Sequence, residues 1–271
     1  MHHDARIYDL ETTGFVADLP YWSALLDQYN PTKVLDLACG TGRITLPLAE
    51  QGVRDQGAFE MVGLDMSQPL LARAREKVAQ ASPAVQAVVS FVEADMRSFC
   101  LDEQFDLILL GFNSLAYVYE LEDQLACLGA VRRHLAPSGR FAIDLLVPQL
   151  GFLDEAQVGG PVRLEVDLRS PEPGIRQFLR TATERYDVIT QRDDTLYFYE
   201  IYHEDGGHER FTDDLAWHMY FPRELELLLR IAGLRVVERF GSYARAPFGH
   251  RSAQYLWVME AMAPHECPHH R

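Results

Sequence analysis

The stretch Val34-Leu35-Asp36-Leu37-Ala38-Cys39-Gly40-Thr41-Gly42-Arg43 decides the fold. It begins as an apolar strand with one aspartate, continues as a turn of small residues and predicts a helix just beyond. Gly40 and Gly42 let the backbone turn tightly and approach a ligand without a Cβ atom in the way. The N-terminus of the next helix presents N–H groups to a negatively charged group. The stretch therefore predicts a strand–turn–helix unit suited to binding a ligand.

Outward from this stretch, short apolar runs alternate with helix-like segments, a pattern that favours a parallel sheet covered by helices. The predicted strands cover residues 34–37, 61–65, 88–93, 105–110, 140–146, 234–240 and 255–260. The predicted helices cover residues 43–51, 68–80, 123–135 and 222–232. We therefore expect an α/β domain with a seven-stranded, mostly parallel sheet and helices on both faces.

The residue pattern changes after Pro148, where turn signals separate segments rich in Thr, Val, Ile, Tyr and Phe. Such segments favour an antiparallel sheet of three or four strands. They cover residues 177–190, 195–204 and 208–221. The expected organisation is a main domain (1–147 and 215–262), an inserted lid (148–214) and a disordered tail (263–271).

Acidic residues occur at the carboxyl ends of the first three strands, the edge at which open α/β sheets bind ligands. Asp36 lies in the first strand, Asp65 ends the second, and Asp95 follows the third. Met66 and Met96 stand beside two of them and offer apolar contact to a ring. One aspartate alone is more often a surface or capping residue, and the glycine turn alone could lack a ligand. Together, however, they predict a nucleoside site.

Four motifs together resemble the class I S-adenosylmethionine-dependent methyltransferases, which have a Rossmann-like fold. They occupy residues 35–42, 63–67, 94–96 and 135–140. The resemblance implies that residues 38–42 cradle the methionine part of S-adenosylmethionine, that Asp65 holds the ribose and that Asp95 with Met96 reads adenine. Ala38 and Ser138 depart from the family pattern, since many members carry glycine there. A dinucleotide site would more often show G-x-G-x-x-G at this turn.

The resemblance continues less specifically outside these motifs. Tyr8 and Tyr21 lie in segments similar to the N-terminal helices that fold over the cofactor in small-molecule methyltransferases. Phe112, just after the fourth strand, joins them as a candidate cofactor contact. Residues 211–214 and 221–225 resemble the inserted sheet and following helix of amino-sugar N-methyltransferases. Similar inserts also occur in O- and C-methyltransferases, so the methylated atom stays open.

The composition limits the classes of partner that the protein is expected to bind. The formal net charge of −15 disfavours nucleic acid and anionic membranes. No run approaches the roughly 18–20 apolar residues that cross a bilayer, and the N-terminus lacks a signal-peptide pattern. Four widely spaced cysteines suit reduced thiols, and a cytoplasmic location is expected. The histidines of the C-terminal tail could bind a metal, but a disordered tail without a metal site is the expectation.

The substrate should meet the segment after the fourth strand, where Asn113 and Tyr117 are candidate contacts. Asn113 could instead cap the next helix. This segment lacks the Asp/Asn-Pro-Pro-aromatic motif of the resembling DNA N-methyltransferases. In the insert, Tyr199 and His203 are further candidates, because alternation places them on one face of a strand. That face could equally pack on the main domain, with the other face forming a homodimer surface.

His218 is the first candidate for a general base, ahead of His203, because imidazole titrates near neutrality. A structural role is the alternative for both. The sequence thus predicts an S-adenosylmethionine-dependent enzyme that methylates nitrogen or oxygen of a small molecule by in-line displacement. Alignment of donor and acceptor supplies much of such a reaction's rate. The alternatives are a methyltransferase for protein or peptide side chains and a non-catalytic S-adenosylmethionine-binding regulator.

Overall fold

The structure is a computed structural model that describes residues 5–12, 14–55, 59–157, 159–169 and 173–263. The chain forms two compact units. The main unit contains Phe15–Val147 and Tyr220–Arg271, and the insert unit contains Met1–Gly14 and Pro148–Met219. Most of the predicted tail lies outside the described residues. Within the described part of the chain, no helix has the length and apolar character needed to cross a membrane.

The main unit is built on a seven-stranded sheet with the order β10-β11-β5-β4-β1-β2-β3. Its strands are β1 (Lys33–Leu37), β2 (Glu60–Asp65), β3 (Val89–Glu93), β4 (Phe105–Leu110), β5 (Leu135–Leu146), β10 (Leu234–Phe240) and β11 (Gln254–Ala261). Strands β1 to β5 pair in parallel, whereas β11 runs antiparallel to both β5 and β10. The predicted seven-stranded, mostly parallel sheet is confirmed.

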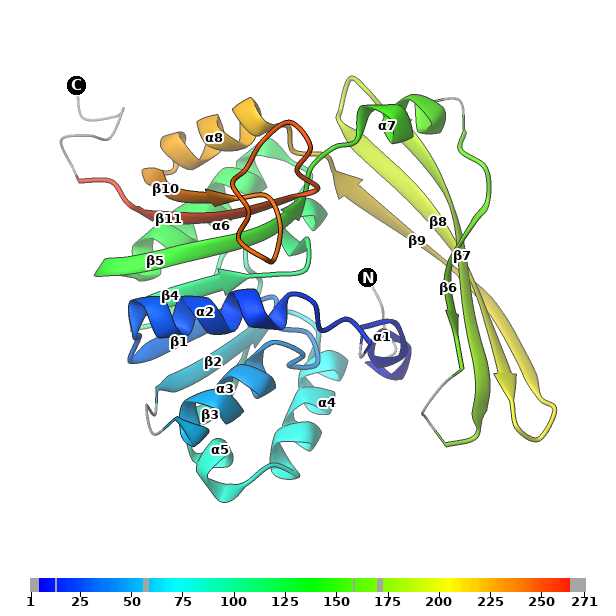
Figure 1. Cartoon of the computed structure of the whole chain (residues 1–271), viewed down its shortest axis with the longest axis horizontal. Helices are drawn as coiled ribbons and strands as arrows, with labels where there is room; N and C mark the ends of the chain where they lie inside the picture. Colours follow the sequence, from blue (N-terminus) through cyan, green and yellow to red (C-terminus); the bar gives the residue numbers. More distant parts are fainter. Residues whose placement is uncertain (1–4, 13, 56–58, 158, 170–172, 264–271) are drawn as a thin grey trace. The chain divides into compact units, whose positions relative to one another are not determined.

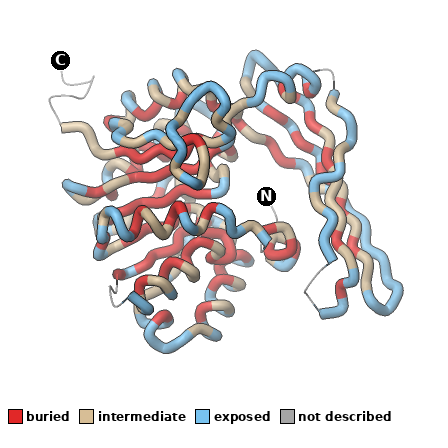
Figure 2. Tube along the Cα trace, viewed as in Figure 1, coloured by how far each residue is buried: buried red, intermediate tan, exposed pale blue. Residues whose placement is uncertain are grey.

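Helices cover both faces of this sheet. They are α2 (Leu19–Tyr29), α3 (Thr45–Arg54), α4 (Gln68–Ala79), α5 (Pro83–Val88), the 3₁₀ helix η1 (Ser114–Tyr117), α6 (Leu121–His134) and α8 (Pro222–Ile231). In Figure 1, α2 and α3 cross the front of the sheet and α6 lies behind it. Trp22, Leu25 and Leu48 of α2 and α3 join Val34 and Leu107 of the sheet in one buried cluster. Figure 2 shows burial concentrated along the central strands.

The start of β5 differs from the sequence prediction. Residues 137–139, a Pro-Ser-Gly segment that predicts a turn, lie inside the strand. The register there jumps from Phe105↔Leu135 to Leu107↔Arg140, so a bulge absorbs the extra residues. A Cβ on Gly139 would come within 2.8 Å of the Phe105 carbonyl oxygen, so glycine permits this close approach.

The insert unit contains a four-stranded antiparallel sheet with the order β6-β7-β8-β9. The strands are β6 (Arg163–Leu168), β7 (Ile175–Asp187), β8 (Arg192–His203) and β9 (His208–His218). Two helices belong to the same unit, α1 (Ala5–Thr12) and α7 (Leu150–Gln157). The antiparallel sheet is confirmed, whereas helix α7 was not predicted from the sequence. This helix has only eight residues, which is too short to establish a helical period in the sequence.

Side chains of β8 alternate between a buried and a more exposed face. Asp193, Thr195, Tyr197, Tyr199 and Ile201 are all buried, and they occupy alternate positions. The register places Arg180 opposite Tyr199 and Glu184 opposite Thr195, so these β7 residues share that face. We call this surface the acidic–aromatic face.

Candidate functional site

The turn after β1 has the backbone conformation that its sequence predicts. Ala38, Gly40 and Gly42 all have positive φ angles, of 58°, 57° and 77°. The amide of Cys39 donates to the carbonyl of Leu64 at 3.0 Å and ties the turn to β2. Ala38 is the costly member, because a left-handed conformation strains a residue with a Cβ atom. A strained turn held by its neighbours is typical of a ligand-binding loop.

Asp65 joins this turn to the end of β2. Its Oδ2 accepts from the amide of Gly40 at 2.9 Å, and its Oδ1 accepts from the amide of Ser67 at 2.8 Å. Burial raises the pKa of Asp65, and these amide donors oppose the rise. An ionised carboxylate has about four acceptor positions, so Asp65 could accept further donors such as ribose hydroxyls.

Asp36 lies deeper than the sequence suggests. Its side chain is buried, and its Oδ2 accepts from the hydroxyl of Thr45 at 2.6 Å. Burial raises the pKa of Asp36 to about 7, against the lowering effect of Thr45 and Arg43. The carboxylate therefore braces the start of α3 beneath the turn.

The contacts of Arg43, which anchor the start of α3, were not identified from the sequence. Arg43 donates through both terminal nitrogens to the carboxylate of Asp18, each at 2.8 Å. Trp22 Nε1 donates to the same carboxylate at 3.0 Å. The guanidinium also lies 4.6 Å from the ring centroid of Phe112 and donates to the carbonyl of Phe15 at 3.0 Å. A bidentate, buried arginine–carboxylate pair thus holds the segment before α2 against the start of α3.

The segment after β4 is clamped onto β5. Phe112 and Asn113 have φ angles of 52° and 61°. The Asn113 amide donates to the Asp144 carbonyl at 2.9 Å, and its side-chain oxygen accepts from the Leu146 amide at 3.0 Å. Asn113 makes no side-chain cap on η1, so the capping alternative does not describe this residue.

Asp144, near the end of β5, was also missed. It accepts from the hydroxyl of Tyr243 at 2.9 Å and from the amide of Phe112 at 3.4 Å. Burial raises the pKa of Asp144 to about 6, while the hydrogen bond from Tyr243 opposes that rise. The charge of Asp144 also contributes to the raised pKa of Tyr21, for which burial is the larger cause. The hydroxyl of Tyr21 is fully buried and has no hydrogen-bond partner among the described residues.

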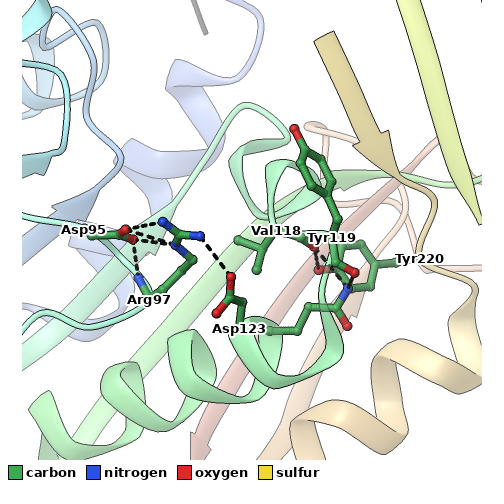
Figure 3. Close-up of polar contacts among 7 residues, drawn as sticks. Asp95, Arg97, Val118, Tyr119, Asp123 and Tyr220 are labelled. Atoms are coloured by element: carbon green, nitrogen blue, oxygen red, sulfur yellow. Dashed lines mark hydrogen bonds and ion pairs between the residues drawn. The ribbon is translucent and has the colours of Figure 1, made fainter. Parts of the chain in front are cut away.

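The remainder of the segment after β4 is held by hydrogen bonds to its backbone carbonyls. Gln124 Nε2 donates to the carbonyls of Val118 and Tyr119 at 3.0 and 3.2 Å. The hydroxyl of Tyr220 donates to the carbonyl of Val118 at 3.2 Å, as Figure 3 shows. Tyr117 is half-buried within η1. The backbone after β4 is therefore fixed at both ends.

Beyond β3, Asp95 is held by Arg97, an arrangement drawn in Figure 3. Nε of Arg97 lies 3.0 and 2.9 Å from the two carboxylate oxygens, and Nη1 donates to Asp123 at 2.9 Å. These hydrogen bonds lower the pKa of Asp95. Met66 is 47% exposed and Phe112 is 37% exposed, whereas Met96 is half-buried. The exposed apolar surfaces are available to a ring.

The remaining predicted residues belong to the insert unit. Tyr8 lies in α1, and Tyr199 is fully buried on β8 with its ring stacked on Phe211 at 4.8 Å. Nε2 of His203 lies 2.7 Å from Glu209, beside the turn between β8 and β9. His218 ends β9 and is buried. Among the described residues, the main unit contains the predicted residues of the β1 to β5 edge together with Tyr21 of α2.

The comparisons with known proteins agree with this geometry. Residues 34–139 match the family described as "Methyltransferase domain". The cypemycin N-terminal methyltransferase from Streptomyces sp. is 30% identical over 247 residues, 90% of this chain and 89% of that protein. The chain belongs to the class I S-adenosylmethionine-dependent methyltransferases. The match spans both the main unit and the insert, so the family assignment covers nearly the whole enzyme.

Solved structures show the same fold as this methyltransferase. The CcbJ methyltransferase from Streptomyces caelestis has a TM-score of 0.74 at 22% identity, covering 97% of this chain and all of that one. A SAM-bound amino pentose methyltransferase from Micromonospora echinaspora has a TM-score of 0.67 at 19% identity, with 93% and 95% coverage. S-adenosylmethionine is the cofactor of this methyltransferase.

The residues of the β1 to β5 edge fit that cofactor. The left-handed turn offers backbone close to a ligand, and Asp65 keeps acceptor capacity for hydroxyl groups. Met66 and Phe112 supply exposed apolar surface for a base. The orphaned hydroxyl of Tyr21 adds a buried polar atom in the same unit. Such an atom calls for a partner, because an unpaired buried hydroxyl costs about 1–3 kcal/mol.

Proposed function

We propose that this methyltransferase transfers a methyl group to an amine nitrogen of a small molecule. The names of two similar proteins point to substrates that carry an amine: the relative is an N-terminal methyltransferase, and the structural neighbour is an amino pentose methyltransferase. An amine carrying a proton is a cation, so its recognition calls for acceptor atoms and negative charge. The insert unit offers both.

The observation that carries the proposal is Asp193 on the acidic–aromatic face. Its side chain is 2% exposed, and its Oδ1 has no hydrogen-bond partner among the described residues. Glu11 and Glu165 on this unit pair with Arg180, and Glu184 contacts Arg163 at 3.4 Å.

Asp193 has no such ion pair within the described part of the chain, so its charge is uncompensated. A buried carboxylate without a partner is costly and needs either a proton or a cationic donor. Burial raises the pKa of Asp193 to about 7, with Glu184 and Asp194 adding to the rise. Tyr197 and Tyr199 place buried aromatic rings on the same face. An ammonium group, which presents only donors, suits this face better than a hydroxyl group does.

In the proposed reaction, S-adenosylmethionine supplies the methyl group of its sulfonium. The thioether that departs needs no proton. The turn at Gly40 and Gly42 would hold the methionine part, Asp65 the ribose, and Asp95 with Met96 the adenine. The chain then mainly has to orient the acceptor, which can lower the barrier by several kcal/mol. An ammonium acceptor must first lose a proton, and His218 stays the candidate base.

The test compares amines with matched alcohols. The enzyme is incubated with S-adenosylmethionine and pairs of amino sugars and their hydroxyl counterparts, together with a short peptide bearing a free N-terminus. S-adenosylhomocysteine release and product mass are measured. Product should form from amines only, and product from the alcohols alone would overturn the nitrogen assignment.

Asp193→Asn should raise KM for an accepted amine roughly 10-fold or more, because an ionised acceptor is lost. Asp194→Asn is the matched control, since this neighbour is exposed and pairs with Arg192. Equal effects of the two substitutions would remove Asp193 from amine recognition. Homodimerisation through the inserted sheet stays a prediction, which light scattering would test.

A further inference from the structure

The contact between Asp95 and Arg97 is more specific than an ordinary surface ion pair. Arg97 is only two residues after Asp95, yet it reaches both carboxylate oxygens through Nε and reaches Oδ2 at 2.5 Å through Nη2. Its own backbone amide donates to Oδ1 at 2.9 Å. Three N–H groups of one residue therefore fix the plane of the Asp95 carboxylate, as Figure 3 shows.

Arg97 is itself fixed at its far end. Nη1 donates at 2.9 Å to Asp123, which lies in the first turn of α6. Negative charge is favourable at that helix N-terminus, so Asp123 is well placed to hold a cation. The guanidinium thus bridges the loop after β3 and the start of α6, which limits rotation of the Asp95 side chain.

The contacts also set how many further donors Asp95 can accept. A carboxylate has about four acceptor positions, and the three N–H groups of Arg97 occupy about three of them. One position is left on a side chain that is 26% exposed. The arginine also keeps the pKa of Asp95 low, so the carboxylate acts only as an acceptor near neutral pH.

We propose that Arg97 is a positioning residue for base recognition, which orients Asp95 so that its one remaining acceptor position receives an N–H of the 6-amino group of adenine. This inference rests on the proposed cofactor site. It assigns to Arg97 the selection of a 6-aminopurine over a purine without that amino group. A solvated ion pair alone would provide no such selection.

The test is a ratio of two dissociation constants, measured by calorimetry without turnover. The probes are S-adenosylhomocysteine and its 6-deamino analogue, in which hydrogen replaces the amino group. The wild-type enzyme should bind the analogue roughly 10- to 100-fold more weakly, the range expected for a hydrogen bond to a charged group. In Arg97→Met this ratio should fall to about 3-fold or less, because the carboxylate regains its rotational freedom.

Asp123→Asn keeps every contact between Arg97 and Asp95 but weakens the hold on the far end of Arg97, so its ratio should lie between those of the wild-type enzyme and Arg97→Met. Arg97→Lys should recover part of the ratio, and it carries the test if Arg97→Met does not fold. An unchanged ratio in a folded Arg97 variant, with both ligands weakened equally, would overturn the positioning role. A wild-type ratio near one would instead show that Asp95 does not read the amino group, whereas the amine-acceptor proposal would be unaffected.

Discussion

Replacing Asp193 by asparagine should change how the stability of the protein depends on pH. Asp193 is 2% exposed and lacks an ion pair within the described part of the chain. Burial raises its pKa from 3.8 to about 7, and the charges of Glu184 and Asp194 add to the rise. The folded protein therefore prefers the neutral acid, whereas the unfolded chain ionises near pH 4. Asparagine imitates the neutral form at every pH.

The direction in which stability changes with pH follows from the coupling of proton binding to folding. A folded-state pKa above the unfolded value gives stability that is fully present below about pH 4 and is lost as pH rises to about 7. Each pKa unit is worth about 1.4 kcal/mol, and about two units lie between pH 5 and pH 8. Relative to Asp193→Asn, the wild-type protein should therefore lose about 2–3 kcal/mol of unfolding free energy over that range. Asp36 and Asp144 titrate nearby with the same sign, but both proteins retain them.

The assay is urea unfolding of both proteins at pH 5, 6, 7 and 8, with equal m-values confirming a common unfolding reaction. The stability difference is the unfolding free energy of the variant minus that of the wild-type protein. The quantity of interest is this difference at pH 8 minus its value at pH 5. Asp194→Asn, at the exposed neighbour, should give a difference within about 0.5 kcal/mol of wild type throughout. If Asp193→Asn runs parallel to wild type at all four pH values, Asp193 is not the uncompensated acid that the proposed amine site requires.

Two further predictions concern packing and proton transfer. Gly111→Ala should lower the unfolding free energy by about 1–3 kcal/mol, because the added Cβ would lie 2.6 Å from Ile44 Cδ1. Gly249→Ala is the control, since its Cβ would meet nothing within 4 Å. Thermal melts of both variants check this prediction. His218→Ala should reduce turnover about 10²–10⁴-fold while cofactor affinity stays constant, because a general base contributes a factor of that order. Unchanged turnover in the folded variant would assign proton transfer to another group.

The turn after β1 and its contact with the end of β2 follow closely from the sequence because their determinants are local. The turn at Gly40 and Gly42 and the aspartate that ends β2 are adjacent to the strands that present them. Strand order then brings β1 and β2 side by side, and Asp65 meets the amide of Gly40. No long-range pairing has to be guessed for this part of the site. The seven strands follow for the same reason.

The anchors around that edge could not be predicted, because each depends on a partner distant in the chain. Arg43 meets Asp18 across 25 residues, and Asp144 meets Tyr243 across 99 residues. A carboxylate in the sequence does not reveal which side chain will face it after folding. Only the position of Arg43, directly after the glycine turn, could have drawn attention to it.

The insert shows the same limit in a sharper form. Alternation along β8 places Tyr197 on the same face as Tyr199, and both side chains are buried. The same alternation places Asp193 on that face, but neighbouring Arg180 and Glu184 come from β7 through a register that the sequence does not specify. Whether Asp193 is a paired surface acid or an uncompensated buried one depends on that register. Its candidate role in amine recognition therefore depends on pairing between strands, which is why the β8 aromatics, and not this aspartate, stand out in the sequence.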